Sequence, residues 1–287
     1  MSDLASEGRI ARSWRLTRAS FAIVRENRAL LALAFLSTLL AMLAVAIIFG
    51  LTALADAGSD GARPQGWIVL AALIAAYPLT FLSVFFNTAI AAAASAAIDG
   101  RRMSIGEALA FPARRIGQVA LWALIAALLG VVVEQVIRRL PFGGSIVARL
   151  AGYAWSLASL FAIPALAIED CPATRCLQRS AQLVKQRWGE GISGNVIVTA
   201  WMVLLTIPLV LVIAVGLALS DGHTAALIAV LALGALALFA IIAVGAVVRQ
   251  TFVVALYRYA VGADTTGPFE ERDLSSPFGR RRRGLFG

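Results

Sequence analysis

The sequence predicts an all-α, polytopic membrane protein with six transmembrane helices and three amphipathic interfacial helices. Three observations lead to this prediction. Hydrophobic residues make up 60% of the 287 residues and charged residues only 14%, whereas a soluble domain carries a larger polar share. Several apolar runs reach the length of about 20 residues that a helix needs to cross a bilayer. Basic residues gather between these runs, in short segments with helical periodicity.

The apolar runs define six spans within one transmembrane domain, residues 1–262. At about 1.5 Å per residue, each span is long enough to cross a hydrocarbon core of about 30 Å. Short links join the first span to the second, the third to the fourth and the fifth to the sixth, which predicts three antiparallel hairpins. The last helix is expected to continue to about residue 262. The predicted spans are 29–54, 67–98, 116–137, 145–168, 191–220 and 224–246.

An amphipathic helix precedes the first span. Its arginines spread over one half of the helix, and its apolar residues share a narrow sector on the other half. Such a helix lies in the plane of the lipid headgroups. The apolar set is Ile10, Trp14, Thr17, Phe21 and Val24, and the basic set is Arg9, Arg12, Arg15 and Arg18.

A shorter helix is expected over residues 104–111, before the third span. The stretch "SIGE" offers a capping box, in which Ser104 and Glu107 satisfy each other's first-turn amides. Pro112 then breaks or restarts the helix. This is the second predicted interfacial helix.

The third interfacial helix is predicted over 172–188, with Asp170 as its cap. Cys171 and Cys176 are interpreted as two ordinary thiols. A metal site needs three or four ligands, and the single histidine, His223, lies far along the chain, so we expect no metal and no cofactor. The apolar or small face is Ala173, Cys176, Leu177, Ser180, Val184 and Trp188, and the polar face is Arg175, Arg179, Gln182 and Gln186.

The basic residues predict the orientation. Of the 25 lysines and arginines, 21 fall on the side that holds the three interfacial helices and both termini. Because short cytoplasmic loops are enriched in cations, both termini are expected in the cytoplasm. Arginine outnumbers lysine 24 to 1, which is typical of a GC-rich bacterial genome, and the bacterial inner membrane is the expected location. The other side holds Arg63, Arg138, Arg139 and Arg149.

The cations flank apolar spans, which favours anionic lipid headgroups over nucleic acid as the partner. The stretch 263–287 is polar and is expected to be a disordered, basic cytoplasmic tail. Its arginine run either binds anionic lipid or serves as a solvated topology signal. The residues expected to contact anionic lipid are Arg12, Arg15, Arg175, Arg179, Lys185, Arg187 and Arg281.

A few polar residues inside the spans are candidate sites. Glu134 and Arg138 are four residues apart and can pair on one helix face, with Arg149 near the same surface. They form either a clasp between the third and fourth spans or a ligand site. Asn87 lies deep in the second span and is expected either to bond to another helix or to bind a substrate. The small residues 91–97 should let that span pack closely against a neighbour.

Several phrases resemble an uncharacterised family of bacterial six-span integral membrane proteins. They are "SWRLTRASFAIVRENRALL" (13–31), "FFNTAIAAAASAAIDG" (85–100), "FAIPALAIEDCPATRCLQRSAQLVKQRWGEGISGN" (161–195) and "VALYRYAVG" (254–262). That family looks related to the membrane domain of glycerophosphoryl diester phosphodiesterases. The resemblance implies a six-helix membrane domain of unknown activity and supplies no catalytic residues.

No cluster of acids and histidines suited to catalysis is recognisable in the sequence. We therefore expect a non-enzymatic scaffold or lipid-interacting protein of the cell envelope, with a membrane-protein partner or a second copy left open. The alternative is a transporter or permease component for a small or lipid-like substrate, because Pro78, Pro164 and Pro208 interrupt predicted spans. An intramembrane enzyme is the third reading and would need polar side chains converging at one depth.

Overall fold

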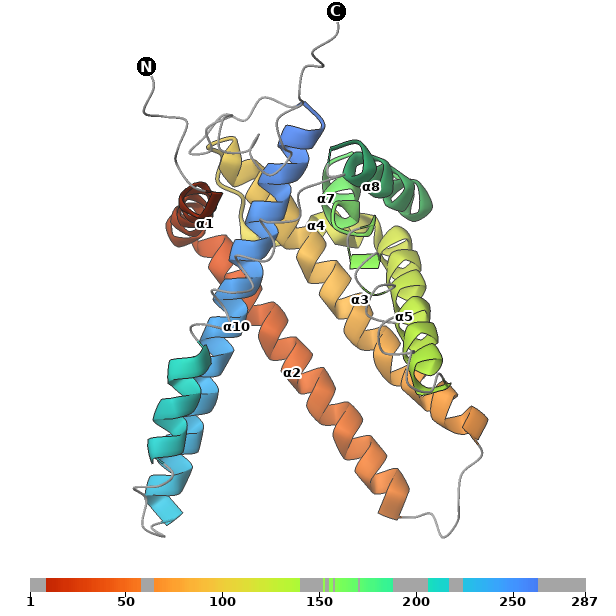
Figure 1. Ribbon diagram of the computed structural model, residues 1–287, viewed down its shortest axis with the longest axis vertical. Helices are drawn as coiled ribbons and strands as arrows, with labels where there is room; N and C mark the ends of the chain where they lie inside the picture. Colours follow the sequence, from red (N-terminus) through yellow and green to blue (C-terminus); the bar gives the residue numbers. More distant parts are fainter. Residues whose placement is uncertain are drawn as a thin grey trace, which may run out of the picture.

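The computed structural model is helical throughout the residues that it describes, with no strand among them. Those residues are 9–57, 65–139, 152, 155–156, 158–169, 171–187, 206–216 and 224–262. A short apolar helix, Thr206–Gly216, accompanies the labelled helices. The labelled helices are α1 (Arg9–Glu26), α2 (Arg28–Ala57), α3 (Gln65–Ile98), α4 (Ile105–Arg114), α5 (Ile116–Arg139), α7 (Ala162–Ile168), α8 (Ala173–Arg187) and α10 (Thr224–Ala260) (Figure 1).

Three described helices are long and apolar enough to cross a membrane, within α2, α3 and α10. A fourth results if α4 and α5, which meet at an angle of 73°, are counted as one bent span. The helices α2, α3, α5 and α10 match the predicted first, second, third and sixth spans, and α10 continues to Ala260 as expected. Of the other two predicted spans, the fourth is described at 152, 155–156 and 158–168, and the fifth at 206–216. The all-helical fold class is therefore confirmed, and the number of six spans stays a prediction.

Helix α3 is the centre of the molecule and contacts α2, α4, α5, α7 and α10. Its alanine-rich part, 89–94, is buried together with Leu30 and Leu33 of α2 and with much of the segment 247–257 of α10. Small side chains let helices approach closely, which is how membrane helices gain packing energy. The expected close packing of the alanine stretch is confirmed.

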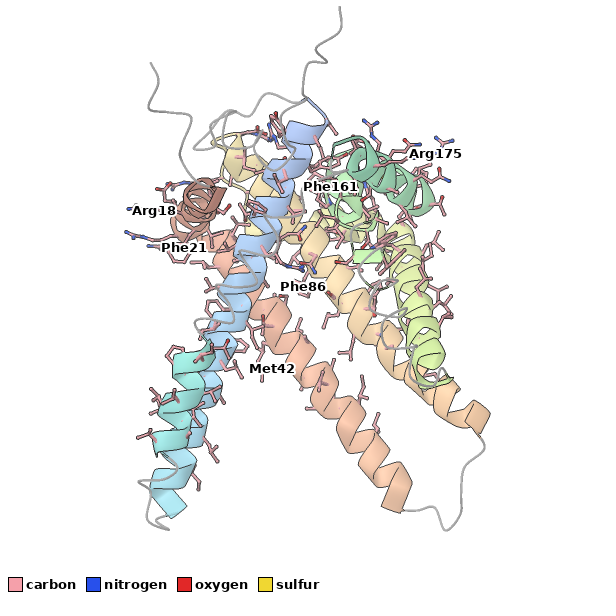
Figure 2. All side chains as sticks on the ribbon, in the orientation of Figure 1. Arg18, Phe21, Met42, Phe86, Phe161 and Arg175 are labelled. Atoms are coloured by element: carbon pink, nitrogen blue, oxygen red, sulfur yellow. A yellow bond between two sulfur atoms is a disulfide. The ribbon has the colours of Figure 1, made fainter. Side chains whose placement is uncertain are left out.

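The helices α1, α4 and α8, which the sequence predicts to be interfacial, gather at one end of the molecule, where α2 begins and α3 and α10 end (Figure 1). We call this the elbow end. The core described above also lies there. Away from the elbow end the helices expose large apolar side chains, such as Met42 on α2, which Figure 2 labels. Large exposed apolar surface is unusual for a soluble protein and suits contact with lipid. The exposed set includes Leu39, Leu43, Ile47 and Leu51 of α2 and Ile228, Leu231, Leu233 and Leu236 of α10.

The helix Thr206–Gly216 packs antiparallel against α10, with a glycine at two of the contacts. A Cβ added to Gly234 would lie 2.6 Å from Cδ1 of Ile213, and one added to Gly216 would lie 2.9 Å from Cγ1 of Val230. Ile213 meets Gly234, whereas Gly216, later in the first helix, meets Val230, earlier in the second. The two helices therefore run in opposite directions, as an antiparallel hairpin requires. The antiparallel packing expected here is seen over these residues, and the membrane crossing of the fifth span stays a prediction.

Candidate functional site

Helix α8 separates its side chains into a buried face and a basic face. Ala173, Cys176 and Ser180 are buried, as predicted, together with Leu183, which the sequence pattern did not include. The basic side chains Arg175, Arg179 and Lys185 are exposed. Figure 2 shows Arg175 on the outer surface of α8, pointing away from the other helices. The helix thus presents its cations outward at the elbow end.

Two residues, Arg115 between α4 and α5 and Gln118 in the first turn of α5, hold the α7–α8 segment in place. The Arg115 guanidinium donates to the Leu166 carbonyl at 2.8 Å, in the last turn of α7. The Gln118 Oε1 accepts from the Ala173 amide at 2.9 Å, at the first residue of α8. Both bonds satisfy helix-end groups that have no partner within their own helix. The Ser180 hydroxyl adds a third link by accepting from the buried Phe161 amide at 2.9 Å.

Replacing Gln118 with alanine should destabilise the protein by about 1 kcal/mol, the usual cost of losing a helix N-cap acceptor. The buried Ala173 amide would lose the acceptor that α5 provides. Thermal unfolding in detergent measures the effect. Gln182→Ala, on the exposed face of α8, is the matched control and should change little. Equal stability of the two variants would contradict the assigned link.

Cys171 and Cys176 are joined as a disulfide, which corrects their interpretation as separate thiols. Their Cα atoms are 5.6 Å apart, within the range that a disulfide can bridge. The first turn of α8 brings Cys176 back beside Cys171, since Cys176 donates its amide to the Pro172 carbonyl. The bridge fixes the entry of α8. Asp170, the predicted cap, lies outside the described residues.

Helix α4 begins with the predicted capping box. The Ser104 amide donates to Glu107 Oε2 at 2.7 Å, and the Glu107 amide donates to Ser104 Oγ at 3.2 Å. The hydrogen bond from the Ser104 backbone lowers the pKa of Glu107. The helix continues through Pro112 and ends at Arg114, so the break lies a few residues later than the proline suggested.

Helix α1 has three kinds of surface. Ser20, Ile23 and Val24 are buried against the protein. Phe21, which was predicted on the same apolar face as Val24, is 49% exposed. It lies beside the exposed Arg18 on the outer side of α1 (Figure 2). This arrangement fits a helix at an interface, with one flank toward protein, one toward lipid and one toward water. Arg12 and Arg15 belong to α1, but their side chains are outside the described part.

Among the described residues, Asn87 forms its hydrogen bonds within α3, whereas its depth suggested a bond to another helix. Its Nδ2 donates to the Ser83 carbonyl at 2.8 Å and to the Ser83 hydroxyl at 3.2 Å. Ser83 lies one turn earlier on the same helix, so both bonds form without a neighbour. The expected inter-helix bond is thus replaced by bonds within α3, and a ligand role for Asn87 stays a prediction.

The proposed Glu134–Arg138–Arg149 site stays untested. Glu134, Arg138 and Arg139 lie on the last turns of α5, but only their backbone is described, and Arg149 and Arg281 lie outside the described residues. Arg187 ends α8, again with its backbone alone described. One described contact between the third and fourth predicted spans is aromatic: Trp122 and Trp155 stack with their centroids 5.8 Å apart.

A charge cluster that the sequence did not reveal joins α3 to α10. The Arg258 Nη2 lies 2.6 Å from Asp99 Oδ1, and its Nη1 donates at 3.2 Å to both the carbonyl and the hydroxyl of Ser95. The Arg258 side chain is only 12% exposed. The guanidinium of Arg258 lowers the pKa of Asp99. Ser95 and Arg258 are 163 residues apart, so no local pattern predicts this contact.

Helix α3 ends in a turn that places Asp99 and the following arginines. Gly100 has φ of 71°, a left-handed conformation that glycine adopts without strain. The Arg101 amide donates to the Ala96 carbonyl, and the Gly100 amide donates to the Ala97 carbonyl. These two bonds form a Schellman motif. The chain then turns away from α3 with Arg101 and Arg102 exposed.

A cavity of about 530 Å³ lies between this turn and the end of α1. We call it the α1–α3 pocket. Its volume falls within the range of about 300–1,000 Å³ that small-molecule sites occupy. Apolar side chains of α1 and α3 form its base, and charged side chains line the rest. The lining residues are Ala22, Ile23, Glu26, Asn27, Ala97, Ile98, Asp99, Gly100, Arg101 and Arg102.

Comparison with known proteins gives one family. Residues 67–267 match the family of unknown function DUF6159. The match covers more than half of the chain, from the start of the predicted second span to just beyond α10, and the chain therefore belongs to this family. No curated protein and no solved structure matches the chain.

Proposed function

We propose that this member of the DUF6159 family is a six-span protein of the bacterial inner membrane whose interfacial helices bind anionic lipid headgroups. In this proposal it is not an enzyme. It serves as a scaffold or lipid-contacting protein of the cell envelope, and a membrane-protein partner or a second copy would dock at the same end. The expected relation to the membrane domain of glycerophosphoryl diester phosphodiesterases belongs to the proposal as well.

One observation carries the proposal: α1, α4 and α8 lie together at the elbow end (Figure 2), and the exposed cations there include Arg18 and Arg25 of α1 and Arg175, Arg179 and Lys185 of α8. The same helices bury small or apolar residues against the protein. Below them α2 and α10 expose large apolar side chains. A basic layer next to an apolar band is the pattern that anionic headgroups and acyl chains would match.

The proposed orientation places α8 in the cytoplasm. Glutathione and thioredoxin keep most cytoplasmic cysteine pairs reduced. The Cys171–Cys176 disulfide is therefore an observation against this side for α8. The arginine distribution supports this side for α8, because 21 of the 25 cations share it.

Neutralising α8 should reduce the enrichment of anionic lipid around the protein. Each cation near an anionic surface contributes about 1 kcal/mol, so Arg175→Gln with Lys185→Gln should lower this enrichment severalfold. The measurement is the lipid composition of polymer-extracted native nanodiscs, compared with the bulk membrane. The matched control, Arg175→Lys with Lys185→Arg, keeps both charges and should behave like the wild type. An unchanged lipid composition in the neutral variant would contradict the proposal.

The alternative function, a transporter or permease component, would need a polar cavity at mid-depth of the membrane. The α1–α3 pocket lies instead at the end of α3, where the apolar segment Ala76–Ile98 stops. Its position supports contact with headgroups more than a path across the bilayer.

A further inference from the structure

We propose that the α1–α3 pocket binds a zwitterionic headgroup that combines a phosphate with a primary ammonium, as phosphatidylethanolamine carries. The inference rests on the proposed function only in assuming that α3 crosses a bilayer. It concerns a site distinct from the basic face of α8. The ligand class follows from which charges in the pocket are already paired and which are not.

The negative charge of Asp99 is already paired with arginines of the protein. Its carboxylate pairs with the Arg258 guanidinium at 2.6 Å and with Arg101 at 3.4 Å. Arg258 also donates to Ser95, so the charge of this aspartate is directed toward the protein. Asp99 therefore does not repel an anion in the pocket as a free carboxylate would.

Two charged residues of the pocket remain unmatched. Glu26 on α1 and Arg102 beyond the α3 turn are both exposed. Within the described part of the chain, neither forms an ion pair or a side-chain hydrogen bond. They line the same pocket from opposite elements. A ligand with one anionic and one cationic end satisfies both residues, whereas a purely anionic ligand would meet the Glu26 carboxylate.

The position of the pocket indicates a lipid. The apolar segment of α3 stops at Ile98, and the pocket begins at that level, where the headgroup layer meets the hydrocarbon core. Phe21, half exposed on α1, lies one residue from Ala22 of the pocket lining and offers contact for an acyl chain. Ile23, Ala97 and Ile98 provide an apolar base. A phosphate at Arg102 and an ammonium at Glu26 would thus sit above acyl chains that run along the helices.

The test uses the full-length protein in mild detergent and measures lipid binding by native mass spectrometry. Phosphatidylethanolamine and phosphatidylglycerol of equal chain length are titrated separately. The wild type is expected to prefer phosphatidylethanolamine. Glu26→Gln should reduce this preference about tenfold, in line with the loss of one charged hydrogen bond. Arg102→Gln should weaken the binding of both lipids, because both carry the phosphate.

Two further variants separate binding from folding. Ala22→Trp fills the pocket from an exposed helix position without changing any charge, and it should abolish the preference for phosphatidylethanolamine. Arg114→Gln removes an exposed cation that does not line the pocket, and it should keep the preference. A preference that survives both Glu26→Gln and Ala22→Trp, or equal binding of the two lipids to the wild type, would overturn the assignment.

A competition arm identifies the source of the headgroup. Free O-phosphoethanolamine that binds without lipid and is lost in Glu26→Gln would support the same chemistry with a soluble ligand. Binding of phosphatidylethanolamine with no binding of free O-phosphoethanolamine would support a membrane lipid as the ligand.

Extraction of membranes with alkaline carbonate tests the proposed function separately. Release of the protein would contradict a membrane-spanning protein, whereas retention without lipid preference would overturn the pocket assignment alone.

Discussion

Replacing Gly234 with valine is expected to destabilise the protein by about 2 kcal/mol, within the range for overpacked contacts. The new Cβ would lie 2.6 Å from Cδ1 and 2.7 Å from Cγ1 of Ile213. Such distances force Ile213 into another rotamer or push the helix Thr206–Gly216 away from α10. Unfolding by a denaturing detergent, followed by tryptophan fluorescence, measures the change in stability.

A second substitution at the same contact makes this result specific. Ile213→Ala removes the two clashing atoms and leaves its Cβ, which is 4.0 Å from the position of the added Cβ. The double variant Gly234→Val with Ile213→Ala should therefore recover much of the stability lost in Gly234→Val. The control is Gly130→Val on α5, where nothing lies within 4 Å of an added Cβ. A loss as large at Gly130, or no recovery in the double variant, would show that the close contact is not the cause.

The sequence predicted those features that depend on local periodicity. The buried face of α8 was recognisable because Ala173, Cys176 and Ser180 recur at helical spacing opposite Arg175 and Arg179. The capping box at Ser104 was recognisable because it needs only four consecutive residues. Apolar length likewise identified α2, α3, α5 and α10. Each of these signals lies within a single element.

The same periodicity could not show which apolar side chains of a helix pack against protein and which are left for lipid. Phe21 and Val24 share an apolar sector of α1, yet Val24 is buried and Phe21 is half exposed. In water an apolar sector has one favourable partner, the core, whereas at a membrane surface lipid is a second one. Which flank meets the protein depends on how α1 leans against α10 and α2, and a single helix does not encode that.

Contacts between distant elements were also beyond the sequence. Arg115 and Gln118 looked like ordinary residues at the start of a span, and their role as partners of α7 and α8 appears only in three dimensions. The expected inter-helix bond of Asn87 failed for the opposite reason. The carbonyl and hydroxyl of Ser83, one turn away on the same helix, already accept hydrogen bonds from the Asn87 side chain.

The pair of Asp99 and Arg258 gives the second large expected effect. Asp99→Asn should destabilise the protein by about 2 kcal/mol, because it removes the carboxylate that lies 2.6 Å from the nearly buried guanidinium of Arg258. Removing one partner of a fully buried pair costs about 3–5 kcal/mol, and Asp99 is partly exposed, at 29%, which reduces the loss. Arg101→Gln is the matched control: it removes the other cation next to Asp99, but Arg101 is 70% exposed and should contribute little.

A double variant distinguishes a lost ion pair from a general loss of packing. Arg258→Met with Asp99→Asn removes both charges and keeps an unbranched side chain in the space of the arginine. Buried ion pairs replaced by apolar groups of similar size often cost little. The double variant should therefore be more stable than Asp99→Asn alone. If the double variant is less stable than the wild type by the sum of the losses in Asp99→Asn and in Arg258→Met, the pair does not act as a unit.

The same pair predicts a pH dependence of stability with a definite sign. Hydrogen bonding to Arg258 lowers the pKa of Asp99 in the folded protein below its ordinary value of 3.8. A carboxyl group with a lowered folded pKa stabilises the fold above its unfolded pKa and loses that contribution as the pH falls through the folded value. The wild type should therefore lose stability more steeply than Asp99→Asn below about pH 4. Parallel stability profiles of the two proteins in this acidic range would show that the Asp99 carboxylate does not stabilise the junction of α3 and α10.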